Sequence, residues 1–223
     1  MSKQKSDQES KIKSLSEDIE LFAHLASHDL KDPLRQAVAN LEEGNGGGDT
    51  KELINNVIDK ISYLREYSHI VNFKGDVEKV NCNEIMQECM SQLSEYLEKN
   101  NAKIIYNDLP EINAVPSNIK TAFLALITNA INFNMNSEKT LDISCLKEDD
   151  YWKFKFSDNG IGIDQVYRKL IFALFQTIEP ESKLSGNGTG LAFCKKIVEN
   201  HDGKIWFETN EQNGTDFYFT IAA

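Results

Sequence analysis

The sequence has little positive charge and no long apolar run. Lysine and arginine number 24 against 35 aspartates and glutamates, which gives a formal net charge of −11 at pH 7. Nucleic acids and anionic membranes attract basic surfaces, so this balance argues against a protein that binds either. No apolar run reaches the ~18 residues that a membrane span needs, and the polar residues 1–13 contain no signal peptide. We therefore expect a soluble, cytoplasmic chain, although a fragment of a longer receptor would share these features.

Cysteine is also scarce and is not arranged as metal sites usually are. The four cysteines, Cys82, Cys89, Cys145 and Cys194, form no C-x-x-C pair. This spacing excludes a zinc ribbon and a thioredoxin-type motif and favours free thiols in a reducing compartment. Hydrophobic residues make up 40% and charged residues 26% of the chain, a composition typical of globular proteins.

The first third of the chain has the apolar spacing of helices. Apolar residues recur every three or four positions from Ile12 to Leu41 and again from Leu53 to Leu64, as on one face of a helix. The glycine-rich residues 44–49 separate the two stripes and predict a turn. Two long helices with a short turn form an antiparallel hairpin, and a second copy would complete a four-helix bundle by dimerisation.

The pattern changes after Gly75-Asp76, so we expect two domains, residues 1–74 and 75–223. In the second, Ser117 is a suitable N-cap for one of the helices. The fold class expected is α+β, with helices on one face of a mainly antiparallel sheet. The predicted helices cover residues 83–100, 117–133, 164–175 and 191–200, and the predicted strands cover residues 102–106, 141–146, 152–157, 204–209 and 216–221.

His28 lies on the face of the first helix nearly opposite its apolar stripe, if each residue turns the helix by ~100°. Asp29 follows directly and Asp32 lies one turn on. A carboxylate beside an imidazole can hold its tautomer and take up its proton, which leaves the other ring nitrogen as a nucleophile. The alternative is an ordinary surface histidine beside an ordinary surface aspartate. Pro33 is expected to kink the helix here.

Three segments of the second domain suggest a nucleotide site. Asp158 ends a predicted strand and begins a D-x-G-x-G motif; its carboxylate could accept a hydrogen bond from the exocyclic amine of adenine, or the motif is only a tight turn. The G-x-G-x-G motif of residues 186–190 opens a helix whose free N–H groups suit phosphate oxygens, or it is a plain loop. Asn129, on a helix with a core-like face, either hydrogen-bonds locally or offers its amide oxygen to Mg²⁺.

Five motifs in this order resemble the sensor histidine kinases of two-component systems, especially phytochrome-type kinases. Ser27–Arg35 looks like the H box of that family and Leu126–Phe133 like its N box. The G1, F and G2 boxes correspond to residues 158–163, 172–175 and 186–191. The resemblance implies a dimeric helical hairpin followed by an α/β-sandwich ATP-binding domain of the GHKL type. It also implies transfer of the ATP γ-phosphoryl group to histidine and then to an aspartate in a response-regulator receiver domain.

The resemblance also implies roles for individual residues. His28 would accept the phosphoryl group, with Asp29 as the adjacent acid that polarises it. Asn129 would bind Mg²⁺, and Asp158 would bind the adenine of ATP. The remaining cofactor-binding positions would be Gly160, Gly162, Gly186, Gly188, Thr189, Gly190 and Leu191.

Three positions depart from the pattern of the family. Ala125 replaces an asparagine and Asn132 a lysine of the N box, and Asp32 replaces the usual threonine or asparagine of relatives that dephosphorylate their regulator. Ala125 and Asn132 leave an alternative: a histidine phosphotransfer or scaffold protein with weak or no autokinase activity. Asp32 argues against dephosphorylation of the regulator. A mechanical GHKL ATPase would not explain His28. With Asn132 in place of lysine, the negative charge of ATP would be neutralised by Mg²⁺ and by N–H groups of the glycine loops. Cations of the lid, the segment between the G1 and G2 boxes, could add to this, such as Arg168, Lys169 or Lys183.

Overall fold

The computed structural model consists of two compact units, Met1–Ser68 and His69–Ala223, and each is described by itself. Its contacts divide the chain within a helix, ahead of the expected boundary at residues 74/75. The described residues are 30–44, 47–72, 75–168, 170–176, 188–211 and 213–223.

The described residues of the first unit form two helices, in the two places where the apolar stripes predicted helices. Helix α2 (Lys31–Glu42) and helix α3 (Gly48–Asn72) are joined through the glycine-rich turn; the last turn of α3 belongs to the second unit. Pro33 lies in the first turn of α2 and not in its interior, and a first-turn residue needs no intrahelical N–H bond. The part of the predicted hairpin that contains His28 lies outside the described residues.

The second unit is built on a five-stranded sheet with the order β2-β4-β5-β7-β6. The pairing of β2 with β4 is parallel and the other pairings are antiparallel. A separate antiparallel pair, β1 with β3, was not predicted. The strands are β1 (Glu78–Asn81), β2 (Ala102–Tyr106), β3 (Glu111–Ala114), β4 (Lys139–Glu148), β5 (Tyr151–Asp158), β6 (Ile205–Thr209) and β7 (Thr215–Ala222).

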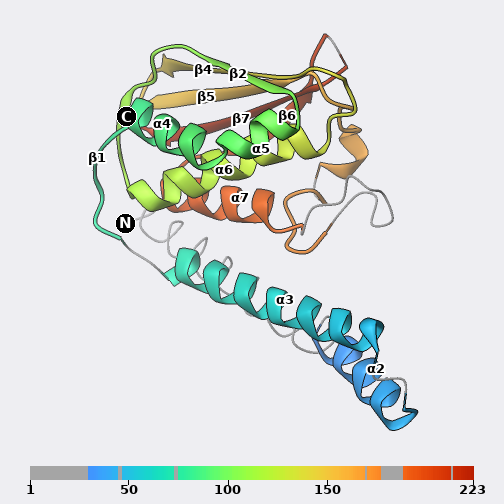
Figure 1. The fold of residues 1–223 in the computed structure, drawn as a ribbon. Helices are drawn as coiled ribbons and strands as arrows, with labels where there is room; N and C mark the ends of the chain where they lie inside the picture. Colours follow the sequence, from blue (N-terminus) through green and yellow to red (C-terminus); the bar gives the residue numbers. More distant parts are fainter. Residues whose placement is uncertain (1–29, 45–46, 73–74, 169, 177–187, 212) are drawn as a thin grey trace. The chain divides into compact units, whose positions relative to one another are not determined.

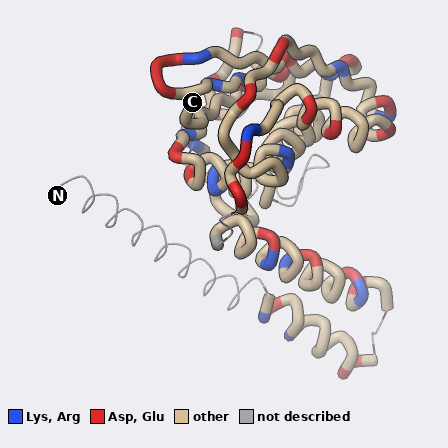
Figure 2. The backbone as a smooth tube through the Cα atoms, turned by 90° about the vertical axis from the view of Figure 1, so that its left-hand side faces the viewer, with Lys and Arg blue, Asp and Glu red and all other residues tan. Residues whose placement is uncertain are grey.

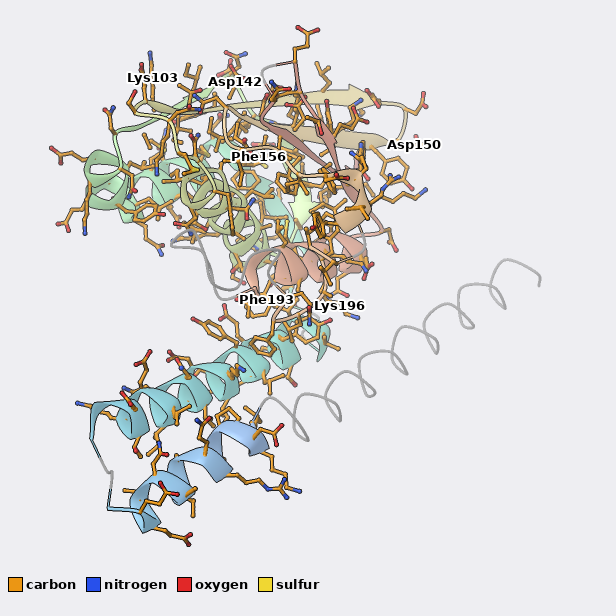
Figure 3. The ribbon with its side chains drawn as sticks, turned by 90° about the vertical axis from the view of Figure 1, so that its right-hand side faces the viewer. Lys103, Asp142, Asp150, Phe156, Phe193 and Lys196 are labelled. Carbon is orange, nitrogen blue, oxygen red and sulfur yellow. The ribbon has the colours of Figure 1, made fainter. Side chains whose placement is uncertain are left out.

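Helices cover one face of this sheet (Figure 1). They are α4 (Cys82–Gln92), α5 (Ser94–Lys99), α6 (Pro116–Asn132) and α7 (Gly190–Asn200). The core is aromatic: the ring of Phe123 on α6 lies 5.8 Å from that of Phe154 and 5.5 Å from that of Phe156, both on β5. Figure 3 shows Phe156 between the sheet and the helices, whereas Lys103 and Asp142 lie on the far face of the sheet. The predicted α+β class, with helices on one face, is confirmed.

In the view of Figure 2, acidic and basic positions are interspersed along the described residues of the second unit. Within the part of the chain that the structure describes, no helix has the length and apolar character needed to cross a bilayer.

Three local predictions were wrong. The helix expected over residues 164–175 is a 3₁₀ turn at Gln165–Tyr167, after which the chain turns to bury Ile171 and Leu174. The apolar spacing there reflects a folded loop with two anchors in the core. Helix α6 begins at Pro116 with Val115 as its N-cap, so Ser117 is exposed inside the first turn and caps nothing. The helix expected over residues 83–100 is divided into α4 and α5 at Leu93.

Candidate functional site

Asp158, the last residue of β5, is buried with one carboxylate oxygen satisfied and the other not. Its Oδ1 accepts hydrogen bonds from the N–H groups of Gly160 (2.8 Å) and Thr215 (3.0 Å). Among the described residues, no group donates to Oδ2, although the residue is only 6% exposed. Burial raises the pKa of Asp158 to about 6; the two N–H bonds oppose this rise and the charge of Asp216 adds to it. A buried acceptor left open is a site for a donor from a ligand.

The glycines after Asp158 let the loop fit between two other segments. A Cβ on Gly160 would lie 2.6 Å from the carbonyl oxygen of Phe133, at the C-terminal end of α6. Gly162 has φ +71° and faces the carbonyl of Asn213 in the β6–β7 turn. Since an L side chain at either position would meet backbone, the D-x-G-x-G motif is more than a generic turn. The loop is held between α6 and the β6–β7 turn.

Asparagine side chains hold the α6 side of this loop. Asn134 is buried, and its Nδ2 donates to Oδ1 of Asn159 at 2.6 Å. The same Oδ1 accepts from the N–H of Thr140 at 2.8 Å. The N–H of Ile161 donates to the carbonyl of Phe133 at 3.2 Å. The end of α6 and the loop after Asp158 therefore form one hydrogen-bonded structure.

Asn129 lies on a half-buried side of α6, and its side-chain amide is free among the described residues. The neighbouring Leu126 and Ala130 are buried, as predicted, whereas Asn129 is half-buried. Its side chain makes no hydrogen bond to any residue that the structure describes, so the local bonding considered from the sequence is not seen there. Among the described residues, no group of three or more His, Cys, Asp or Glu side chains could hold a metal ion. The amide oxygen of Asn129 suits Mg²⁺ that takes its other ligands from phosphates and water.

The two N-box positions that depart from the family pattern, Ala125 and Asn132, each lie where α6 approaches another helix. A Cβ on Gly190, the first residue of α7, would lie 3.4 Å from the Cβ of Ala125, so α6 and α7 approach closely at this point. Asn132 is exposed, and its Oδ1 accepts a hydrogen bond of 2.5 Å from the hydroxyl of Tyr96 on α5. That bond leaves the amide N–H groups of Asn132 as donors.

The second glycine motif opens α7 as predicted. Thr189 is the N-cap residue, yet its buried hydroxyl makes no capping hydrogen bond. The N–H groups of Gly190, Leu191 and the next residue have no acceptor among the described residues, as at any uncapped helix start. Gly188 has φ +64°, and its carbonyl accepts from the N–H of Phe175 at 2.8 Å. This end of α7 presents donors suited to an anion.

The structure thus brings several predicted residues together around α6. Its C-terminal end contacts the loop after Asp158, and Ala125 contacts the start of α7. Arg168 is exposed. His28, Asp29, Gly186, Lys169 and Lys183 lie outside the described residues. The sequence did not indicate Thr215, Asn210 and Asn134, because each bonds to Asp158 or Asn159 from a segment distant in the chain. The Asn213-Gly214 pair is a local signal near two of them, but it predicts only a turn.

Comparisons with known proteins agree with this geometry. Residues 114–223 match the family of histidine kinase-, DNA gyrase B-, and HSP90-like ATPases. The phytochrome-like protein Cph1 of Synechocystis sp. is 31% identical over 92% of this chain and 29% of its own length. The chain therefore spans less than a third of that relative.

Solved structures show the same fold. The catalytic domain of histidine kinase ThkA is 27% identical, with a TM-score of 0.58 over 66% of this chain and 96% of that one. ThkA in complex with the response regulator protein TrrA has a TM-score of 0.69 over 98% of this chain and 66% of that one; at 23% identity this likeness concerns the fold alone. Residues 114–223 belong to the histidine kinase-, DNA gyrase B-, and HSP90-like ATPases, and the chain has the GHKL core of a sensor histidine kinase.

Proposed function

We propose that this chain is an ATP-dependent protein histidine kinase that phosphorylates His28 and passes the phosphoryl group to an aspartate of a response-regulator receiver domain. The observation that carries the ATP half is the buried carboxylate of Asp158, with one oxygen fixed by N–H groups and the other open. In this proposal residues 1–74 form the dimerisation and phosphotransfer hairpin, and residues 75–223 form the ATP-binding domain.

In this proposal, one set of residues binds ATP and another set transfers the phosphoryl group. Asp158 accepts a hydrogen bond from the exocyclic amine of adenine, and the N–H groups at the start of α7 bind phosphate oxygens. Asn129 would hold Mg²⁺, which would supply positive charge to neutralise the phosphates. A ring nitrogen of His28 then attacks the γ-phosphorus, the bond to the ADP oxygen breaks, and Asp29 takes up the imidazole proton. Such a transfer needs chiefly alignment and charge neutralisation, which suits a site with few catalytic groups.

A labelling experiment tests this proposal. Incubation with γ-labelled ATP and Mg²⁺ is expected to give an acid-labile, base-stable label on the protein. The label should be absent in both His28→Gln and Asp158→Asn. Calorimetry should show that His28→Gln still binds ATP and that Asp158→Asn does not. His69→Gln is the matched control, because His69 is an exposed histidine on α3, and it should keep the label.

The alternative function has its own outcome. Ala125 and Asn132 remove one oxygen ligand and one cation from the usual N box, which would favour a phosphotransfer or scaffold protein with weak or no autokinase activity. That function is correct if the wild-type protein takes up no label from ATP but accepts phosphate from a phosphorylated regulator. A wild-type protein that shows no Mg²⁺-dependent ATP binding by calorimetry overturns the nucleotide assignment itself.

We also propose that the chain forms a homodimer through its hairpin. Helices α2 and α3 each leave three apolar side chains exposed at i, i+4, i+7 spacing, Leu34, Val38 and Leu41 on α2 and Ile54, Ile58 and Ile61 on α3. Such stripes are buried when helix pairs associate into a four-helix bundle. Light scattering should give the dimer mass, and a strict monomer at micromolar concentration would overturn this assembly.

A further inference from the structure

A polar cluster lies on the far face of the sheet, next to Asp158. Its centre is Asp216 on β7, a buried carboxylate that accepts four hydrogen bonds. Oδ1 accepts from the hydroxyl of Ser157 (2.5 Å) and from Nδ2 of Asn210 (3.3 Å). Oδ2 accepts from Nζ of Lys155 (2.6 Å) and from the hydroxyl of Tyr218 (3.1 Å). A buried charge with this many partners is well fixed in space.

Asn210 connects this cluster to the main chain of Asp158. Its Nδ2, besides facing Asp216, donates to the carbonyl oxygen of Asp158 at 2.8 Å. Its Oδ1 accepts from the N–H of Gly214 at 2.9 Å. The next residue is Thr215, whose N–H holds the carboxylate of Asp158. One side chain therefore contacts the backbone at Asp158 and the turn that carries its carboxylate partner.

We propose that Asn210, held by Asp216, is a positioning residue that aims the open carboxylate oxygen of Asp158 at the adenine of ATP. This inference rests on the proposed ATP-binding function. It goes beyond the five motifs, because Asn210 and Asp216 belong to none of them. Loss of the Asn210 amide removes its bonds to the carbonyl of Asp158 and to the N–H of Gly214. The main-chain bonds of the β6–β7 turn remain, so we expect both segments to be held less firmly and the protein to stay folded. The carboxylate then keeps its two N–H donors but is held less firmly in its direction.

The cluster also sets the charge around Asp158. Asp216 repels the ionised form of Asp158 and so raises its pKa. Burial raises the pKa of Asp216 itself, but hydrogen bonds from Lys155, Ser157 and Asn210 outweigh this and hold it below its ordinary value. Among the described residues, β4 and residues 133–138 also hold Asp158 or its loop, through Leu141, Phe133, Asn134, Asn136 and the carbonyl of Glu138. Glu138 is the one acidic residue in this set, and it is exposed.

The first experiment measures ATP affinity by calorimetry on the full chain. Asn210→Ala should weaken binding about fivefold, the effect of one lost hydrogen bond, while thermal melting shows that the protein is folded. Glu211→Gln is the matched control, since Glu211 is an exposed neighbour in the same turn, and its affinity should equal that of wild type. Wild-type affinity in a folded Asn210→Ala protein would overturn the proposal.

The second experiment measures ATP affinity against pH, which a merely structural role would not move in a directed way. Affinity should fall in acid as Asp158 becomes protonated. Asp216→Asn removes a repelling negative charge and should move the midpoint of this fall to lower pH. Lys155→Gln leaves the charge of Asp216 uncompensated and should move the midpoint to higher pH. Glu208→Gln, on the strand position opposite Asp216, should leave it unchanged.

The outcomes separate this inference from the function on which it rests. Opposite shifts for the Asp216 and Lys155 variants support the inference. Shifts of equal sign, or unmoved midpoints in proteins that bind ATP, overturn it and leave the proposed function intact. Lys155 is partly exposed, so its variant is expected to fold. If Asp216→Asn does not fold, a midpoint raised in Lys155→Gln supports the inference, and a lowered or unmoved midpoint overturns it. A wild-type protein without ATP binding at any pH overturns both.

Discussion

The hairpin and the ATP-binding unit differ in how completely they bury their apolar side chains. Six leucine, isoleucine and valine side chains of the hairpin are between 37% and 55% exposed. In the second unit, the four phenylalanines of the central cluster are at most 1% exposed, and the rings of Phe154 and Phe219 stack at 4.7 Å. The second unit completes its own core, whereas the hairpin presents a face that a second copy would cover.

Removal of a core ring is the largest effect we expect, and it belongs to the second unit alone. Phe154→Ala should lower the free energy of unfolding by about 3–5 kcal/mol, because a large cavity replaces the ring. Urea unfolding followed by circular dichroism measures this loss, which should not depend on protein concentration. Tyr151→Ala on the same strand is the control, since Tyr151 is exposed; an equal loss there would contradict the contrast between the units.

A charge in the hairpin stripe should act on association instead of folding. Ile58→Asp should raise the dimer dissociation constant about 100-fold, because each copy loses an apolar contact and gains a buried charge. Analytical ultracentrifugation measures it. Asn56→Asp adds the same charge about half a helical turn from Ile58, on an exposed position, and should leave the dimer intact. If both variants dissociate alike, the stripe is not the interface.

In the ATP-binding unit, the ionised form of one buried residue, Asp158, should lower the free energy of unfolding. Asp158 has a pKa raised to about 6 by burial, so the fold favours its protonated form. The stability that it contributes is present below its ordinary pKa of 3.8 and is lost as pH rises through about 6.

At pH 8, Asp158→Asn should therefore be more stable than wild type by on the order of 2 kcal/mol, while it loses ATP binding. Chemical unfolding of both proteins between pH 8 and pH 5 checks this, and the difference should shrink through pH 6. A variant less stable than wild type at pH 8 would show that the charged carboxylate is favourable in the fold.

The smallest effects distinguish a true helix cap from a predicted one. Asn81 is the N-cap of α4, and its side chain accepts from the N–H of Asn83 at 3.0 Å. Asn81→Ala should cost about 1 kcal/mol of unfolding free energy. Ser117→Ala should change it by less than about 0.5 kcal/mol, because Ser117 caps nothing. Both should leave dimerisation unchanged, and a larger loss from Ser117→Ala would restore the capping role.

Regular elements with strong local signals were predictable. The strand over residues 102–106 and the helix ending at Asn200 agree with the structure, as does the final hairpin. The failures had competing tertiary causes. Residues 164–175 have helical spacing but are held as a loop by two core anchors, Ile171 and Leu174. No local pattern marks His201, yet its Nε2 accepts from the N–H of Val115 and its Nδ1 lies 2.7 Å from the carbonyl of Ile197.

The sequence by itself determined the order of the motifs, the α+β class and the chemical groups at Asp158 and Asn129, because composition, spacing and glycine position are local properties. Only the tertiary structure decided that Asp158 is buried with one oxygen open, since its partner Thr215 lies 57 residues further on. The same holds for Asn210 and Asp216, which reach the site from another strand pair. Hydrogen-bond partners across a sheet depend on register and packing, and no local pattern records them.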